Sequence, residues 1–357
     1  MSGVPREASG FTPGWLSDVL GVTVTGVTTE DIGAGSGIFG IITRLRLTHD
    51  GGAPDSLIAK LPTTAAANLE VGRALRMYER EARFYLEVAD RVPVRLPRCH
   101  FAALDTDTGD ACLLLEDLCD LAVGDQLVGL TQREAELATD ALADVHARFW
   151  ESDELAELGW LPTVDEPIYM ATVPAIFHGG WPVVRASFAP VIEPAAAAVA
   201  DAVDACFEEI TRRCGGGPTT VIHTDSRLDN LFFSPADTGE LAIIDWQLAL
   251  RGRGVSDLAY LLATSMEPAD QDRLFPVLVR RYHDRLLAGG VTGYPFERCL
   301  RDYREHALYY LCGAVSMAAT FDTANERGAA LTRAFVVRTF HHLLACDAAA
   351  ALPGVPA

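Results

Sequence analysis

The sequence predicts an α+β protein with a strand-rich first part and a mainly helical second part. Three observations indicate this class. Extended segments rich in β-branched or alternating residues gather in the first third. Helical periodicity dominates beyond residue 120, where only two short apolar strands, 219–222 and 241–244, interrupt it. Strands followed by helices are typical of α+β proteins. We therefore expect an N-terminal lobe over 1–118 and a C-terminal lobe over 119–357.

The first part is expected to contain a capped helix, two strands around a glycine cluster, a third strand, a long helix and an apolar strand that ends in acids. These elements cover 12–20, 32–47, 56–62, 66–90 and 112–118. The second part is expected to contain long helices and the two short strands, which form a small hairpin region. These helices cover 131–150, 190–213, 268–288, 297–321 and 325–350.

Composition narrows the class of function. The chain has 357 residues, 49% of them hydrophobic, which is enough for a sizeable core. No apolar run reaches the roughly 18 residues of a membrane span, and the start lacks a secretory pattern, so a cytoplasmic location is expected. The eight cysteines are scattered without a C-x-x-C pair, which favours buried thiols over zinc or disulfides.

The charge is strongly acidic. With 49 acidic and 29 basic residues, the formal net charge of −20 works against binding to nucleic acid or anionic lipid. A neutral or cationic small molecule suits this balance better as a partner, although the charge can equally serve solubility alone. The sequence leaves open whether the protein is a monomer or a homodimer.

The stretch VIHTDSRLDNLFF (221–233) places many polar groups between two apolar runs. Asp225 precedes Asn230 by five residues, and Asp245 ends the next apolar strand, an arrangement used to transfer a phosphoryl group. Asp225 would orient a hydroxyl and take its proton, while Asn230 and Asp245 would supply hard oxygen ligands for divalent cations. A structural alternative remains, because Asp and Asn also close turns.

Glycines and a lysine in the first part suit the same chemistry. Gly35, Gly37 and Gly40 match G-x-G-x-x-G between two predicted strands, a context that favours a lid over phosphates rather than a dinucleotide fold; an ordinary glycine-rich hairpin is the alternative. Lys60 lies within an apolar strand, where a buried ammonium needs an anion. In a kinase, its partners are phosphates and a helix glutamate.

Helical spacing selects that glutamate. Glu81 shares a face with Met77, Tyr78 and Tyr85, whereas Glu79 lies on a more polar face. Glu81 is therefore the expected partner of Lys60, with a surface position as the alternative.

Taken in order, these motifs resemble those of the aminoglycoside phosphotransferase and choline-kinase-like families, which share a two-lobed protein-kinase-like fold. The resemblance is carried by H-T-D-S-R-L-D-N (223–230), I-D-W-Q (244–247) and D-L-A (257–259). The D-W-Q form is similar to the ecdysteroid-kinase-like branch. Further likeness in 78–85, 115–118 and 142–150 extends the match from about residue 33 to 262.

The resemblance implies a role for each matching residue. It makes Asp225 the catalytic base, Asn230 and Asp245 the magnesium ligands, Lys60 and Glu81 the phosphate-positioning pair, Gly35 and Gly37 part of the nucleotide site, Glu116 to Leu118 the nucleobase contact, and Asp257 a support of the catalytic loop. Thr224 departs from the pattern because glycine is usual there, so a backbone with negative φ is expected. The Arg-Asp pair of protein kinases is absent, which makes a protein kinase the weaker interpretation.

The resulting hypothesis is a kinase that transfers the γ-phosphoryl of ATP or GTP to a hydroxyl of an aminoglycoside, another sugar-bearing or nucleoside antibiotic, or an amino alcohol. The alternative is a nucleotide-binding scaffold that has lost catalysis. Candidate acceptor-side residues fall within 165–190 and 300–327; they are His178, Trp181, Asp302, Tyr309, Asp322 and Glu326.

Overall fold

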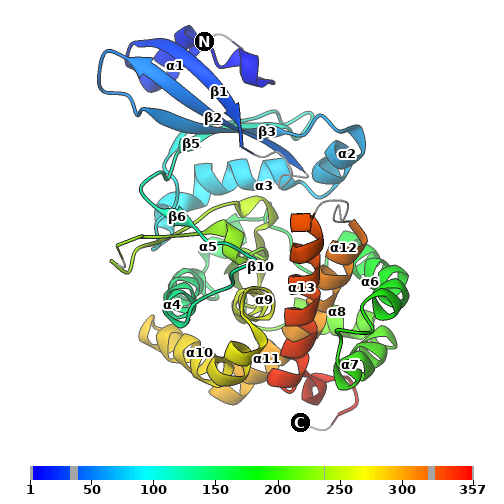
Figure 1. Ribbon diagram of the computed structural model, residues 1–357. Coiled ribbons are helices and arrows are strands. Elements are labelled where there is room, and N and C mark those ends of the chain that lie inside the picture. The colour runs from blue at the N-terminus through cyan, green and yellow to red at the C-terminus, as the bar shows by residue number, and fades with distance from the viewer. Residues whose placement is uncertain (1–2, 33–38, 237, 321–325, 356–357) are drawn as a thin grey trace. The chain divides into compact units, whose positions relative to one another are not determined.

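The structure is a computed structural model that describes residues 3–32, 39–236, 238–320 and 326–355 (Figure 1). Contacts divide the chain into two compact units. The first comprises Met1–Leu121 together with the returning segment Ala242–Leu248, and the second comprises Ala122–Leu241 and Ala249–Ala357. The sequence-based division after residue 118 did not include this returning segment in the first unit.

The first unit is built on a five-stranded antiparallel sheet of order β1-β2-β3-β5-β4. Its strands are β1 (Val24–Asp31), β2 (Gly40–His49), β3 (Ser56–Pro62), β4 (Cys99–Leu104) and β5 (Ala111–Glu116). On the central strand β3, Lys60 pairs with Ile42 on one side and with Leu113 on the other. Residues alternate across this strand, so Lys60 faces away from the neighbouring core residues Ala59 and Leu61.

A short helix closes one face of the sheet. Helix α1 (Pro13–Leu20) begins where Thr12 Oγ1 accepts from the Trp15 amide at 3.2 Å, and it ends at Gly21 with φ 67°. Its buried Trp15 packs in the core with Leu45, Leu57 and Leu114. The capped helix expected from the sequence is thus present.

The expectation of one long helix over 66–90 is wrong, because the chain forms two separate helices there. Helix α2 (Ala66–Ala74) stops, Arg76 takes a left-handed φ of 53°, and α3 (Met77–Arg83) starts in a new direction. A π-helical turn, Phe84–Val88, follows. The break lets the Tyr78 ring pack across Gly72, where an added Cβ would lie only 2.6 Å from the Tyr78 oxygen. Tyr78 also donates to the Phe39 carbonyl at 2.7 Å.

The returning segment is fixed to the first unit by an aromatic stack. Strand β9 (Leu241–Ile243) brings the chain into this unit, where the Ile243 amide donates to the Arg95 carbonyl at 3.1 Å. The Trp246 ring then lies 4.1 Å from that of Phe84, with an angle of 7° between the planes. Trp246 is 1% exposed. This stack positions Asp245 beside α3.

The second unit is mainly helical. Its helices are α4 (Gln132–Phe149), α5 (Glu154–Glu157), α6 (Pro167–Ser187), α7 (Pro194–Asp204), α8 (Phe207–Gly215), α9 (Val255–Ser265), α10 (Pro268–Ala288), α11 (Phe296–Tyr309), α12 (Leu311–Thr320) and α13 (Glu326–Ala345). Its strands are β6 (Ala122–Val123), β7 (Thr220–Ile222), β8 (Leu231–Phe233) and β10 (Leu250–Gly252). The expected hairpin of 219–222 with 241–244 is wrong, because β7 pairs with β10.

Helix α9 is the core of this unit, because all its residues are buried and it packs against α4, α10, α11 and α13 (Figure 1). Around it, α4 and α10 are joined by ion pairs such as Arg281 to Asp140 and Arg285 to Asp144, both 2.6 Å.

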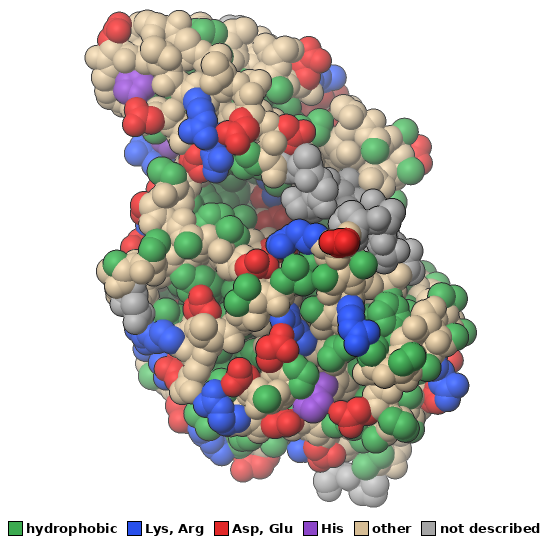
Figure 2. Space-filling model, viewed as in Figure 1, with side chains coloured by type: hydrophobic (Ala, Val, Ile, Leu, Met, Phe, Trp, Pro, Cys, Tyr) green, Lys and Arg blue, Asp and Glu red, His purple; other side chains and the backbone are tan. Residues whose placement is uncertain are grey.

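Acidic and basic side chains are interspersed with hydrophobic ones on the face shown in Figure 2. Within the described ranges, no helix is long and apolar enough to cross a membrane.

The Trp246 stack gives a test of the returning segment. Trp246→Ala would remove a buried ring and leave a cavity, so we expect the free energy of unfolding to fall by about 3–5 kcal/mol in denaturant titrations. The control Val128→Ala, at a side chain that is 72% exposed, should change it by less than about 0.5 kcal/mol. A loss below about 1 kcal/mol for Trp246→Ala would contradict the packing described.

Candidate active site

One polar cluster lies in the second unit, on the loop between β7 and β8. The Asp225 carboxylate accepts from Asn230 Nδ2 at 3.0 Å on one oxygen and from the Tyr260 hydroxyl at 3.1 Å on the other. Arg227 Nε lies 3.4 Å from the same carboxylate. Asn230 Nδ2 also donates to the Asp225 carbonyl at 2.8 Å, so the hydrogen bonds of this nitrogen stay within the loop, and the side-chain oxygen of Asn230 is an acceptor group.

The backbone of this loop adopts a conformation that was not expected. Thr224 has φ 65°, in the left-handed region, so the expectation of a negative φ is wrong. A β-branched residue rarely adopts this region, and the strain costs about 1–3 kcal/mol. The structure therefore keeps at Thr224 the conformation that glycine would adopt freely.

Asp257, from the buried helix α9, supports the strained residue. Its carboxylate accepts from the amides of His223 and Thr224, each at 2.7 Å. Burial raises the pKa of Asp257, but hydrogen bonds and positive potential from His146 and His223 outweigh it and keep the pKa below its usual value. Asp257 is 0% exposed, so its charge rests entirely on these donors.

The second polar cluster lies in the first unit, around Lys60. Lys60 Nζ is 2.7 Å from Glu81 Oε1 and 2.7 Å from Asp245 Oδ1. Gln247 Nε2 donates to the other oxygen of Asp245 at 3.3 Å. Glu79, by contrast, lies on the outer side of α3 and is 3.4 Å from Arg83. The structure thus brings Lys60 together with the glutamate that helical spacing selects.

Charge is unbalanced in this cluster, with one ammonium between two carboxylates. Burial lowers the pKa of Lys60, but Asp245 and Glu81 outweigh it and raise the pKa above its usual value. Burial also raises the pKa of Glu81, to about 7, since repulsion from Asp245 adds to it and Lys60 opposes it only in part. This excess of negative charge attracts a further cation or favours the uptake of a proton.

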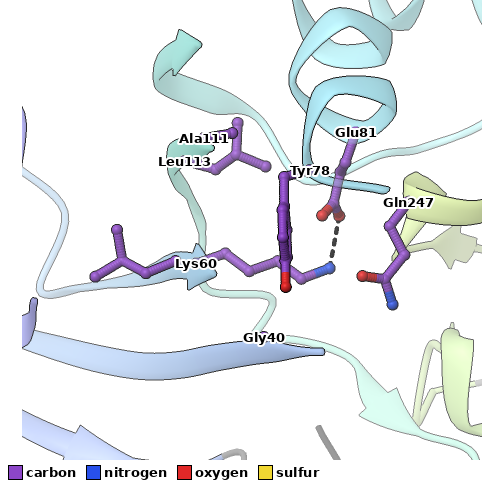
Figure 3. Close-up of a pocket in the computed structure, with 8 residues that line it drawn as sticks. Gly40, Lys60, Tyr78, Glu81, Ala111, Leu113 and Gln247 are labelled. Carbon is purple, nitrogen blue, oxygen red and sulfur yellow. Dashed lines mark hydrogen bonds and ion pairs between the residues drawn. The ribbon is translucent and has the colours of Figure 1, made fainter. Parts of the chain in front are cut away.

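A small pocket opens onto this cluster (Figure 3). It is lined by Gly40, Lys60, Leu61, Tyr78, Glu81, Ala111, Leu113 and Gln247. Figure 3 shows Lys60 extending from its strand toward Glu81, with Tyr78 alongside. A charged end beside apolar walls is what a nucleotide would require.

Other predicted nucleotide contacts are placed less directly. Gly35 and Gly37 lie outside the described residues. The Glu116 amide donates to the Arg98 carbonyl at 2.8 Å, and its carboxylate accepts from Arg95 at 3.0 Å. Leu118 is buried, and its carbonyl accepts from the Leu121 amide at 3.1 Å. These backbone groups are thus engaged within the protein.

Most of the predicted acceptor-side residues form hydrogen bonds, ion pairs or ring contacts within the protein. His178 is bound by Asp204 and Glu208 at 2.7 and 3.1 Å, and the Trp181 indole donates to Asp201 at 3.0 Å. Asp302 is buried with Arg253 and Arg298. Tyr309 contacts the Phe207 and Tyr310 rings, Glu326 is exposed at the start of α13, and Asp322 is outside the described residues.

The oxygen groups of the two clusters suit magnesium. Among the described residues, no group of three or more His, Cys, Asp and Glu side chains is arranged to bind a metal by itself. Mg²⁺ commonly takes one or two protein oxygens and completes its shell with phosphates and water. Asp245 in the first unit and the side-chain oxygen of Asn230 in the second are each oxygen groups of this kind, so each by itself fits a metal that arrives with a nucleotide.

Three residues at these clusters were missed by sequence reasoning: Tyr260, which donates to Asp225; Gln247, which donates to Asp245; and His146, which contacts Asp257 at 3.1 Å. Tyr260 and Gln247 each lie two or three residues from a motif acid, and this proximity could have identified them. His146 is far from Asp257 in sequence, so no local signal connects them.

The raised pKa of Glu81 predicts a pH dependence. Between its ordinary pKa of 4.5 and about 7, the folded protein binds a proton at Glu81 that the unfolded chain has released. The free energy of unfolding should therefore fall as pH rises through this window, by up to about 1.4 kcal/mol per pH unit. Glu81→Gln should lose this component in denaturant titrations at several pH values.

Glu79→Gln serves as the control on the same helix, because the Glu79 side chain is partly exposed and pairs with Arg83. It should keep the pH dependence of the wild type. Equal slopes for wild type and Glu81→Gln between pH 4.5 and 7 would contradict the burial and repulsion described.

Comparison with known proteins identifies the family and the fold. The sequence profile of the ecdysteroid kinase-like family matches residues 34–289. Among solved structures, APH(2")-IIia in complex with GDP and kanamycin is similar at a TM-score of 0.55 and 12% identity, covering 91% of this chain and 96% of that one. The Plasmodium vivax ethanolamine kinase is similar at a TM-score of 0.50 and 12% identity, covering 90% and 81%.

Curated relatives match over short stretches only. Acyl-CoA dehydrogenase family member 10 of Mus musculus is 39% identical over 67 residues, which are 19% of this chain and 6% of that protein. Family member 11 of Gallus gallus is 45% identical over 40 residues, 11% and 5% of the two chains. The chain thus spans a small part of the length of these relatives. The solved structures confirm the α+β, two-lobed kinase-like fold, and the matched profile shows that the chain belongs to the ecdysteroid kinase-like family.

Proposed function

We propose that the chain is a small-molecule kinase that transfers the γ-phosphoryl group of ATP or GTP to a hydroxyl. The observation that carries this proposal is the ammonium of Lys60, buried between Glu81 and Asp245 at the edge of a pocket. A lone structural ion pair would need one carboxylate. The second carboxylate gives the cluster a net negative charge. A metal-bound nucleotide would bind there with its metal at Asp245 and its phosphates at Lys60.

The loop of the second unit supplies the complementary groups. As the acceptor oxygen bonds to the γ-phosphorus, its proton passes to the Asp225 carboxylate. The bond between the γ-phosphorus and the bridging oxygen breaks, and its electron pair stays on the nucleoside diphosphate. Asn230 orients Asp225 through its amide nitrogen and offers its oxygen to a cation. Magnesium, when bound, would neutralise the charge on the phosphates.

The nature of donor and acceptor is supported by likeness and charge. A nucleotide donor agrees with the GDP complex of the similar APH(2")-IIia, and both ATP and GTP remain candidates. Kanamycin and ethanolamine, the ligands that the similar proteins' names include, carry amines. A net charge of −20 would attract such cationic acceptors, so we propose an amino alcohol, an aminoglycoside or a related antibiotic as the acceptor. A cytoplasmic location would supply the nucleotide.

The test is transfer of label from γ-labelled ATP and GTP, with magnesium, to a panel of amino alcohols, aminoglycosides and nucleoside antibiotics. Asp225→Asn removes the proton acceptor without changing its size, so we expect kcat for the best acceptor to fall at least about 100-fold. Asp229→Asn makes the same charge change in the same loop and should lower kcat less than about threefold.

Full transfer by Asp225→Asn would exclude Asp225 as the base. Nucleotide binding without transfer to any acceptor, in wild type, would instead indicate a scaffold that has lost catalysis.

A further inference from the structure

A cleft of about 260 Å³ lies in the second unit, where helices α4 and α10 end. A Cβ added at Gly289 would lie 2.5 Å from the Ala147 Cβ, so the two helix ends are in direct contact. The volume suits several water molecules or one small organic molecule. The cleft is lined by Ala147, Trp150, Glu151, Gly289, Gly290, Val291 and Thr292.

Glu151 occupies a position that is locally unfavourable in two ways. It follows Trp150, the C-cap of α4, and has a left-handed φ of 47°. Glycine is the usual residue in this conformation after a helix, because a side chain makes it costly. A carboxylate there also lies at the negative end of the helix dipole, where lysine or arginine is favourable. A residue that opposes both backbone and charge preferences is typical of a functional position.

Neutral groups hold the Glu151 carboxylate in place. Its Oε1 atom accepts from the Thr219 amide and from the Thr219 hydroxyl, the latter at 3.2 Å. The Glu151 amide donates in turn to the Thr219 carbonyl at 2.8 Å. These donors orient the carboxylate and do not neutralise it. A glutamine could accept the same hydrogen bonds, so they account for the length of the side chain but not for its charge.

The arginines that could offset the charge are paired with other acids. Arg148, in the last turn of α4, lies 3.0 Å from Glu154, and Arg285, in the last turn of α10, lies 2.6 Å from Asp144. The carbonyl ends of an 18-residue and a 21-residue helix thus meet the Glu151 carboxylate at this cleft. Their partial negative charges add to that of the carboxylate, so the cleft favours a cation.

Trp150 gives the cleft an aromatic wall. All five tryptophans lie within the described ranges, and Trp150 is the only one of them that is not buried. Its ring lies 4.8 Å from that of Tyr294, which is 5% exposed and supports it from the protein side. The face of a tryptophan ring attracts ammonium groups, and quaternary ammonium ions in particular are bound in this way.

We propose that this cleft binds a small organic ammonium ion through the Glu151 carboxylate, the Trp150 ring and the two helix C-termini. Thr219, which holds Glu151, directly precedes β7, whereas the loop with Asp225 follows β7. The cleft therefore lies at the opposite end of this strand from the proposed catalytic base. The inference goes beyond the proposed kinase activity and does not depend on it.

Acrylamide quenching of tryptophan fluorescence tests the site directly, because Trp150 alone among the tryptophans is not buried. The probe is tetramethylammonium chloride, which has no hydroxyl and so cannot accept a phosphoryl group. We expect it to lower the quenching constant saturably at millimolar concentrations or below. Sodium chloride at equal ionic strength and tert-butanol, which has a similar shape without the charge, should give no saturable protection.

Variants separate charge from packing. Glu151→Gln keeps an acceptor for Thr219 and removes the charge, so the apparent affinity for tetramethylammonium should fall at least about tenfold. Glu157→Gln, at an exposed acid of α5, makes the same change in net charge and should alter the affinity less than about twofold. Trp150→Leu, followed by saturation-transfer NMR of the probe's methyl signal, should also weaken binding at least about tenfold. Thermal melting checks that each variant is folded.

Asp225→Asn distinguishes this cleft from the acceptor site of the proposed kinase, and it should protect Trp150 as the wild type does. Protection no greater than with sodium chloride or tert-butanol would overturn the inference. Equal affinity in wild type, Glu151→Gln and Trp150→Leu, or loss of protection in Asp225→Asn, would overturn it as well. None of these measurements uses phosphoryl transfer, so a failure of the proposed kinase activity would leave their result unchanged.

Discussion

The carboxylate of Asp257 is the constraint on which the second unit depends. It is a charge with no access to water, so it needs donors on every side, and the fold provides them from the loop amides and from His146. Removing a donor would leave a buried charge under-satisfied, which is costly. The same bonds that stabilise this charge impose a left-handed backbone on Thr224. The same hydrogen bonds therefore determine both the stability of the buried core and the geometry of the loop.

The first unit uses buried charge in a related way. Lys60 extends from β3, on which the adjacent residues face the core. Glu81 contacts Lys60 because the helix α3 begins after the left-handed Arg76. Asp245 reaches the same point from the returning segment, which the stack of Trp246 on Phe84 holds in place. Rigid elements therefore set the separation of these three charges. Two carboxylates face one ammonium in this cluster, and the excess of negative charge suits the metal-bound nucleotide that we propose.

Local sequence patterns predicted the fold class and the partner of Lys60, but features that depend on contacts between distant residues were not predicted. Helical spacing selected Glu81 over Glu79, and the fold class followed from the order of strands and helices. The left-handed backbone at Thr224 could not be predicted. The steric strain that opposes it is local, whereas the hydrogen bond that holds the Thr224 amide comes from Asp257, 33 positions away. The pairing of β7 with β10, and the return of 242–248 to the first unit, were missed for the same reason, since short apolar strands do not encode their partners.

Calorimetric titration of ATP and of GTP, each with and without magnesium, tests the central claim most directly. The claim is that Lys60 and Asp245 form a site for a metal-bound nucleotide. We predict saturable binding of at least one nucleotide that weakens at least tenfold without magnesium and to the same extent in Asp245→Asn. Binding that is absent, or that is equal with and without the metal and unaffected by Asp245→Asn, would contradict the account.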